Sequence, residues 1–435
     1  MTARVLVPHM SRAGRPGPIV GLVTLLALGL GSCAVPEPSP DPSPTPLVSS
    51  PASSPASTPA PVDAQTSMAR LFAAGVAGDR AGWDAGVATR DAAFAVRSAL
   101  LFDNLRILAP ARLRVRLSGA EQPLGPVRRA ELGPGARVVQ ARIVWRLRGE
   151  RADASATVWL TLVPGPHGDV LAGTDDGTTL DTPATPLWWL AGVTRVSRGD
   201  VTVLVGPGQD AARWAALARR AAADAHDDLP RPLRDRWDGH LLVEVPGSEA
   251  DFARVLGAVP SAYATTAAVT RPEGPTTGAA VRVVVNPATA EDSDAELGTT
   301  LVHETVHVAT RSAGSDAPLW AVEGLAEHVA LQAHPDQRRD ERAVLSAGER
   351  PRRLPADASF TAGGKDVTAA YAQAWLVCLA VDEHRGGSDL GRFYLALDDG
   401  RSVEAAARAT LGVDDAVVLR WWRDALRQAT ADRPG

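Results

Sequence analysis

The chain has 435 residues, which at roughly 150 residues per domain leaves room for two or three domains. Apolar residues make up 45% of it and charged residues 22%, which excludes a wholly disordered, collagen-like or multi-span membrane protein. A formal net charge of −5 argues against a dedicated nucleic-acid-binding protein, and two cysteines are too few for a disulfide framework.

The first 33 residues have the layout of an export signal. Three arginines and no acidic residue precede a twelve-residue apolar run, 19–30, which is too short to span a bilayer comfortably. This run ends in Leu30-Gly31-Ser32-Cys33, which resembles a bacterial lipoprotein lipobox. The resemblance implies that Cys33 is lipidated and anchors the chain at the outer face of the bacterial cytoplasmic membrane. A plain signal peptide with an incidental cysteine is the alternative.

Residues 34–62 are predicted to form a tether. Ten of these 29 residues are proline, interleaved with serine, threonine and alanine. Such a composition keeps a chain extended and cannot build a core. We therefore expect a stalk between the membrane anchor and the folded sequence, which begins near Asp63.

The first folded unit, 63–193, is predicted to be an α+β accessory domain. It begins with two helical segments, 68–77 and 91–108. Apolar and polar residues then alternate in four stretches, which predicts strands at 113–117, 139–147, 156–162 and 169–172. Helices followed by such a meander predict an antiparallel sheet with one face packed on the helices. The order loosely resembles a nuclear-transport-factor-2-like cone, and the unit shows no catalytic constellation.

The second unit, 194–435, mixes short apolar strands with helices. Strands are predicted at 201–205, 241–245 and 279–285, and helices at 211–225 and 250–256. This order predicts a mixed sheet with helices against it. Further helical segments predict a closed helical C-terminal subdomain, at 371–381, 390–397, 403–411 and 417–426.

A His-Glu-x-x-His motif, formed by His303, Glu304 and His307, carries the chemistry of this unit. Its helix is predicted to begin at Ser293 or Asp294, either of which can cap it. Because four residues make about one helical turn, both imidazoles lie on one face and can converge on a zinc ion. Glu304 is then placed to act as general base on a zinc-bound water. The alternative is a surface helix with two ordinary histidines.

Residues 318–327 are predicted to enter a second helix. A catalytic zinc needs a third protein ligand, and Glu323 stands sixteen residues after His307, far enough for a loop and a returning helix. Glu327, one turn later, can accept the ring N–H of a ligand histidine and fix its tautomer. Gly324 would let the two helices pack closely. The alternatives are an exposed acidic stripe and a three-histidine site, for which the downstream glycine and histidine spacing is missing.

Together these residues resemble the gluzincins, the thermolysin-like zinc metallopeptidases, and most closely their small peptidase-MA-like branch in exported bacterial proteins. The pattern His-Glu-x-x-His followed by Pro-x-Trp-x-x-Glu-Gly-x-Ala is present without a gap. The resemblance covers about 200–435 and implies a zincin-like domain with one zinc per chain. It implies His303, His307 and Glu323 as zinc ligands, Glu304 as base and Glu327 as the carboxylate that supports a ligand histidine.

The resemblance also implies a downstream tyrosine or histidine that stabilises the oxyanion. Tyr371 starts a predicted helix at a place where that branch often has a tyrosine, and the alternative is an aromatic residue packed on the core. His384 is the second candidate, although the sequence around it is typical of a helix C-terminus. A protonated histidine there would simply favour the helix dipole.

These observations predict a membrane-anchored, extracytoplasmic zinc peptidase that acts on a peptide or protein substrate and binds no nucleic acid. Two other classes stay open. One is a catalytically silent, peptidase-like lipoprotein that acts as a binding or sensor module. The other is a cell-wall-associated structural protein in which the unit 64–190 does the work. An intact Glu304 and a third-ligand candidate favour the enzyme.

Overall fold

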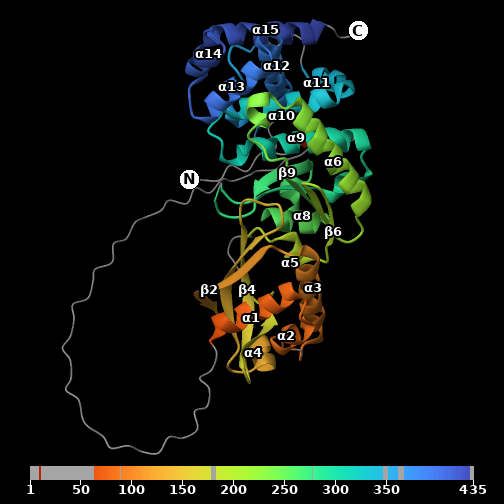
Figure 1. The fold of residues 1–435 in the computed structure, drawn as a ribbon, viewed down its shortest axis with the longest axis vertical. Helices are drawn as coiled ribbons and strands as arrows, with labels where there is room; N and C mark the ends of the chain where they lie inside the picture. The colour runs from red at the N-terminus through yellow and green to blue at the C-terminus, as the bar shows by residue number, and fades with distance from the viewer. Residues whose placement is uncertain are drawn as a thin grey trace, which may run out of the picture.

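The computed structural model describes residues 9–10, 63–88, 90–177, 183–276, 278–345, 351–360 and 367–431. Figure 1 shows three parts that follow one another along the long axis: a four-stranded sheet with its helices, a six-stranded sheet, and a helical C-terminal region. The predicted tether and Cys33 lie outside the described residues. So does the predicted signal peptide, except for the two-residue strand β1 (His9–Met10).

The N-terminal part is an α+β unit, as the sequence predicted. Four strands form an antiparallel meander in chain order: β2 (Arg112–Gln122), β3 (Arg137–Arg146), β4 (Ala154–Gly165) and β5 (Gly168–Gly173). Three helices pack on it: α1 (Ala64–Ala77), α2 (Arg80–Ala85) and α3 (Ala92–Leu108). The helices α4 (Pro126–Leu132) and α5 (Leu187–Leu190) are too short to show a helical period in the sequence.

Local sequence explains where these elements begin and which face they bury. An aspartate caps each of the three packed helices, because Asp63, Asp79 and Asp91 accept hydrogen bonds from backbone N–H groups of the first turn. Along β3 every second residue faces the helices, so that Ile143 and Trp145 are buried in the core. The alternation seen in the sequence is therefore the inner face of the meander.

The six-stranded sheet is mixed, with strand order β1-β9-β10-β8-β7-β6. Its strands beyond β1 are β6 (Thr194–Arg198), β7 (Val201–Val205), β8 (Leu241–Val245), β9 (Thr266–Pro272) and β10 (Val281–Val285). The central strands β7, β8 and β10 are parallel, whereas β6 and β9 run antiparallel to their neighbours. Helical segments connect the strands: α6 (Ala211–Asp228), α7 (Arg231–Arg234), α8 (Glu249–Leu256) and η1 (Pro260–Tyr263).

The helical region confirms the predicted C-terminal subdomain. Its helices are α9 (Asp294–Thr310), α10 (Leu319–Ala333), α11 (Arg338–Ala343), α12 (Val367–Arg385), α13 (Gly387–Asp398), α14 (Val403–Thr410) and α15 (Asp415–Ala431). Short 3-10 turns lie before and between these helices: η2 (Pro287–Glu291), η3 (Ser312–Gly314), η4 (Pro335–Gln337) and η5 (Asp357–Phe360).

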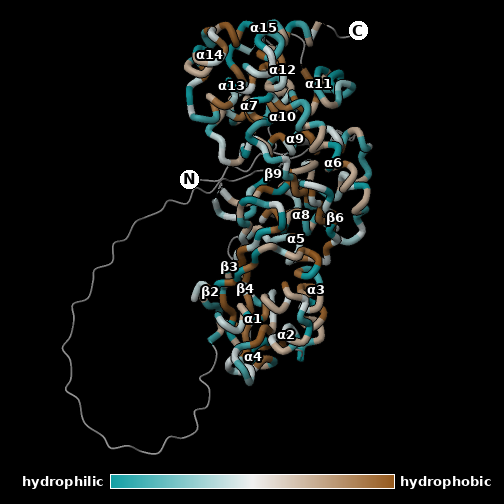
Figure 2. Tube along the Cα trace, in the orientation of Figure 1, coloured by the Kyte–Doolittle hydropathy of each residue, from teal (hydrophilic) through white to brown (hydrophobic). Residues whose placement is uncertain are grey.

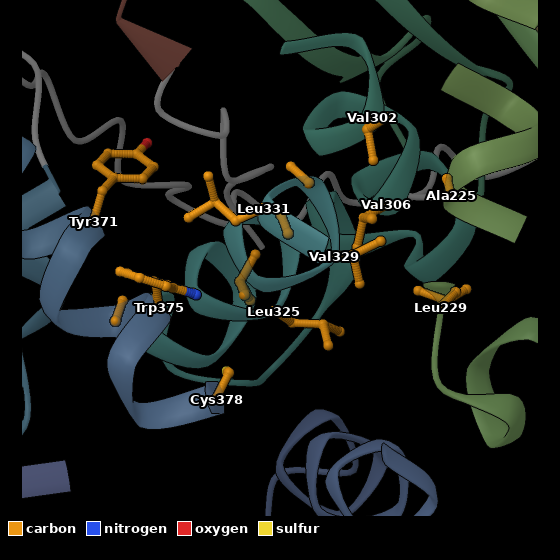
Figure 3. Packing of buried hydrophobic residues seen from close by; sticks show 14 of the residues in the cluster. Ala225, Leu229, Val302, Val306, Leu325, Val329, Leu331, Tyr371, Trp375 and Cys378 are labelled. Atoms are coloured by element: carbon orange, nitrogen blue, oxygen red, sulfur yellow. The ribbon is translucent and has the colours of Figure 1, made fainter. Parts of the chain in front are cut away.

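Helix α10 lies in the middle of this region. Figure 3 shows Leu325 and Val329 of α10 between Trp375 of α12 on one side and Val306 of α9 on the other. A Cβ on Gly324 would lie 2.4 Å from the carbonyl oxygen of Ala374 in α12. The glycine therefore permits a close approach of α10 to α12, rather than to α9 as the sequence suggested.

Two hydrophobic clusters stabilise the molecule. One lies between the helical region and one face of the six-stranded sheet. The other fills the N-terminal unit and continues to the opposite face of the six-stranded sheet, where it includes Leu204, Leu242 and Val284. Figure 2 shows hydrophobic segments in both sheets and in the helices packed on them. This second cluster includes residues on both sides of the predicted domain boundary between 193 and 194. The boundary therefore stays a prediction.

A buried cluster of charged groups also joins the two units. Arg282 of β10 is 1% exposed, and its guanidinium donates hydrogen bonds to Glu150 of the N-terminal unit and, over 2.8 Å, to Glu273. Glu244 of β8 lies 4.0 Å from the same guanidinium. Burial and the neighbouring charge of Glu273 raise the pKa of Glu244 to about 8, although Arg282 opposes the shift. The arginine therefore stabilises three buried carboxyl groups at once.

Replacing Arg282 with methionine is expected to lower the free energy of unfolding by about 3–5 kcal/mol at pH 8, because buried carboxylates lose their cation. The loss should be smaller at pH 6, which lies below the pKa of about 8 of Glu244, so that this carboxyl group is protonated. Chemical denaturation at both pH values measures it. Arg112→Met is the control, because Arg112 pairs with the half-exposed Asp153, and it should cost about 1 kcal/mol or less. Equal losses in the two variants would contradict the expected role of Arg282.

Candidate metal centre and catalytic site

The helix α9 carries the His-Glu-x-x-His motif and begins at the predicted place. Ser293 accepts a hydrogen bond from the backbone N–H of Glu296, whose carboxylate accepts one from the backbone N–H of Ser293. This reciprocal capping box is encoded by Ser-x-x-Glu. The motif lies in the last two turns, where His303, Glu304 and His307 are all buried. The motif therefore faces the interior, which removes the surface-helix alternative.

The structure brings His303, His307 and Glu323 together. The Nε2 atoms of the two histidines lie 3.0 Å apart, and Oε2 of Glu323 lies 3.3 Å from each of them. The three side chains are at most 1% exposed. Helix α10 delivers Glu323 because it folds back across α9 after the turn that ends at Pro318. Glu323 is thus a member of the cluster and not part of an exposed acidic stripe.

A polar side chain contacts the Nδ1 atom of each histidine, on the ring side away from the cluster. Nδ1 of His303 lies 3.1 Å from Oε2 of Glu327, and Nδ1 of His307 lies 3.0 Å from the hydroxyl of Ser312. When Nδ1–H donates to these acceptors, the lone pair of Nε2 points into the cluster, as a metal ligand requires. Glu327 has the place that the sequence predicted. Ser312 was missed, because nothing in the sequence marks a serine in η3 as facing α9.

The side chains of this cluster shift one another's pKa values strongly. Burial lowers the pKa of His303, but the hydrogen bonds and charges of Glu323 and Glu327 outweigh it and raise the pKa to about 10. Burial raises the pKa of Glu323, but the charges and hydrogen bonds of His307 and His303 outweigh it and lower the pKa to about 2. At neutral pH these pKa values correspond to a protonated His303 beside an ionised Glu323.

The residues present fit a zinc ion. Two imidazole nitrogens and one carboxylate oxygen are the donor set of a known class of catalytic zinc site. These atoms all lie within 4.8 Å of one another. Oε1 of Glu323 is buried and has no hydrogen-bond partner, which is costly unless another group satisfies it. Among the described residues, this is the one group of histidine, cysteine or acidic side chains whose ligand atoms lie close enough together to hold a metal ion.

Zinc binding at neutral pH is expected to release about one proton, because a metal ligand must be deprotonated and His303 has a pKa of about 10. Glu323 should release none, since its pKa is about 2. Zinc affinity should consequently rise about tenfold per pH unit between pH 6 and 8. Isothermal titration calorimetry in buffers of different ionisation enthalpy counts the protons. Zinc binding without proton release would contradict the charge state described for His303.

Tyr371 lies beside the cluster, whereas His384 does not. The ring centroid of Tyr371 is 6.1 Å from that of His303. Burial raises the pKa of Tyr371 well above 10, and the charge of Glu323 adds to it, so the phenol stays protonated and can donate a hydrogen bond. Nδ1 of His384 bonds to the carbonyl of Ala380, and its ring stacks on Trp421 with a centroid distance of 4.5 Å. The geometry thus favours Tyr371 over His384.

Thr270 is a second residue that sequence reasoning missed. It lies on β9, and its hydroxyl bonds to the carboxylate of Glu304. The strand was not predicted, because Thr-Ala-Ala-Val-Thr-Arg-Pro shows neither an apolar run nor an alternation. The contact joins elements 34 residues apart in the chain, so no local pattern could indicate it.

Comparison with known proteins gives likeness to solved structures only. No family model matches the chain, and no curated protein matches it. It is similar to an M1 zinc metallopeptidase from Deinococcus radiodurans, with 14% identity and a TM-score of 0.32 over 75% of this chain and 63% of that one. A mutant of that enzyme matches with 15% identity and a TM-score of 0.33, over 72% and 62%. The chain spans about three fifths of the length of these structures.

Proposed function

We propose that this protein is a zinc-dependent peptidase that hydrolyses peptide bonds. The observation that carries the proposal is the buried convergence of His303, His307 and Glu323, with Glu304 next to it on the same helix. In this proposal His303, His307 and Glu323 bind one zinc ion per chain, and Glu327 and Ser312 orient the two imidazoles. Glu304 is the general base.

The roles of the side chains follow from their chemistry. Zinc, when bound, supplies a Lewis acid that lowers the pKa of water and polarises a carbonyl group. Glu304 accepts the proton of the attacking water and later delivers it to the leaving amine. The protonated phenol of Tyr371 donates a hydrogen bond to the oxyanion of the tetrahedral intermediate. These steps need no other side chain to change its protonation state.

The pairing along the outer edge of β9 is consistent with a peptide substrate. The strand β1 pairs with it in antiparallel register, with His9 opposite Ala268 and Met10 opposite Thr266. An extended segment therefore pairs along this edge, and β-strand addition is a common way to bind peptides. Because β9 also carries Thr270, a peptide lying along it would pass close to Glu304.

We further propose that the protein acts outside the cytoplasm, held to the outer face of the cytoplasmic membrane by lipid on Cys33. Residues 1–33 support this proposal, because a basic segment, an apolar run and a lipobox-like sequence follow one another there. The proline-rich tether that comes next in the chain supports it as well. Helices of the described part are all too short or too polar to cross a bilayer. The catalytic unit would then reach its substrate from a stalk.

The test is hydrolysis of a fluorogenic peptide library and of casein by purified protein spanning residues 63–435. We expect about one zinc per chain by elemental mass spectrometry, and cleavage that disappears with o-phenanthroline and returns with added zinc. Protein that binds zinc and cleaves nothing would favour a peptidase-like binding or sensor module. Protein that binds no zinc would overturn the proposal.

A further inference from the structure

The contact between Thr270 and Glu304 is the starting point. The hydroxyl oxygen of Thr270 lies 2.5 Å from Oε2 of Glu304 and 3.1 Å from the backbone carbonyl oxygen of the same residue. Both side chains are 1% exposed. A threonine hydroxyl has one proton to donate, and a carboxylate is its stronger acceptor. The hydroxyl thus binds the carboxylate that the proposed reaction uses.

We propose that Thr270 is a positioning residue, which holds Glu304 in the orientation needed for proton transfer. The inference rests on the proposed function. Engaging Oε2 in a short hydrogen bond restricts rotation of the carboxylate and leaves Oε1 as the oxygen that takes the proton from water. A general base works only when it is within hydrogen-bond reach of that proton, so the orientation contributes directly to the rate.

The strand β9 is a rigid support for this hydroxyl. Successive residues of a strand face opposite sides, and Ala268 packs in the cluster below the helical region, whereas Val269 packs in the other cluster. Thr270 therefore faces α9. Its partner across the ladder to β10 is Val283, and the next β10 residue toward the start of that strand is the buried Arg282. Because threonine is branched at Cβ, few rotamers are open to it on such a strand.

The hairpin of β9 and β10 is in turn fastened to the N-terminal unit. The backbone N–H of Ser155 in β4 donates to the carbonyl of Glu273 over 2.8 Å, and the N–H of Ala280 donates to the carbonyl of Asp153 over 3.1 Å. Arg282 adds its bonds to Glu150 and Glu273. The N-terminal unit thus fixes the strand that carries Thr270, although none of the three clustered side chains, His303, His307 and Glu323, belongs to that unit.

Two variants of Thr270 test the inference. Thr270→Val removes the hydroxyl at constant shape and is expected to lower kcat about 10- to 100-fold, with KM and zinc content within about twofold of wild type. Thr270→Ser keeps the hydroxyl and is expected to retain kcat within about threefold. Thr299→Val is the control, because it removes a buried α9 hydroxyl that donates a hydrogen bond to the backbone carbonyl of Ala295. Its kcat should stay within about twofold of wild type.

A crystal structure of each variant provides a readout besides activity. The Glu304 carboxylate is expected to keep its place in Thr270→Ser and to rotate or occupy several rotamers in Thr270→Val. In a Glu304→Gln background, Thr270→Val should cause little further loss of kcat, because the two residues act as one unit.

The outcomes separate this inference from the proposed function. Zinc-loaded wild-type protein that cleaves nothing overturns the proposed function. An active wild type with unchanged kcat in Thr270→Val overturns the positioning role. Equal loss in Thr270→Val and Thr270→Ser also overturns it, because a hydroxyl kept in Thr270→Ser would then fail to hold Glu304 in place.

Discussion

Replacing Glu304 with glutamine is expected to lower kcat for peptide hydrolysis by about 10³-fold, within the range of about 10²–10⁴ that a general base contributes. The amide keeps the size and most of the hydrogen bonds of the carboxylate but cannot accept a proton. Zinc content should be unchanged, since Glu304 is not among the three clustered ligand groups. Steady-state kinetics and elemental mass spectrometry on the same preparation measure both quantities.

Glu296→Gln is a matched control for this change. Glu296 is an exposed carboxylate of the same helix that takes part in the capping box. Its substitution should cost at most about 1 kcal/mol of stability and leave kcat near that of wild type. Hydrolysis that survives Glu304→Gln undiminished would refute the assignment of the base, and would direct the search to another proton acceptor or to a contaminating peptidase.

Replacing His307 with alanine is expected to abolish stoichiometric zinc binding. The change removes one of the three proposed ligands, and its effect on affinity should exceed the roughly 10- to 100-fold loss that accompanies removal of an outer hydrogen-bond partner. Glu327→Gln is such an outer change, because Glu327 contacts Nδ1 of His303 and not the centre of the cluster. Zinc per chain after dialysis, and competition with a fluorescent chelator, measure the two losses.

The order of the two losses is the decisive result. His307→Ala should retain no zinc under conditions in which Glu327→Gln keeps most of it. Both proteins should remain folded by circular dichroism, because neither residue belongs to the buried Arg282 cluster. Zinc binding by His307→Ala at wild-type affinity would show that the metal lies elsewhere, and the convergence of His303 and Glu323 would then be a structural ion pair.

Local sequence was sufficient for most of the elements around the site. The capping box at Ser293 starts α9, the spacing of His303 and His307 places both on one face, and the one-turn spacing of Glu323 and Glu327 directs both toward the histidines. These signals lie within one helix or one turn, so chain geometry alone determines them. The strands β7 and β8 could likewise be predicted as short, mainly apolar runs, although Thr202 and Glu244 interrupt them.

Local patterns in the chain were enough to predict the α+β class, the alternation that builds the four-stranded meander, and the groups that can bind a metal. Three contacts could not be predicted in this way: Thr270 with Glu304, Ser312 with His307, and Arg282 with Glu150 of the other unit. Each of these contacts depends on how separate elements pack, through hydrogen bonds between side chains that have no periodic signature. A local sequence pattern indicates which face of a helix or strand is buried. Which other element packs against that face depends on the packing of the whole chain.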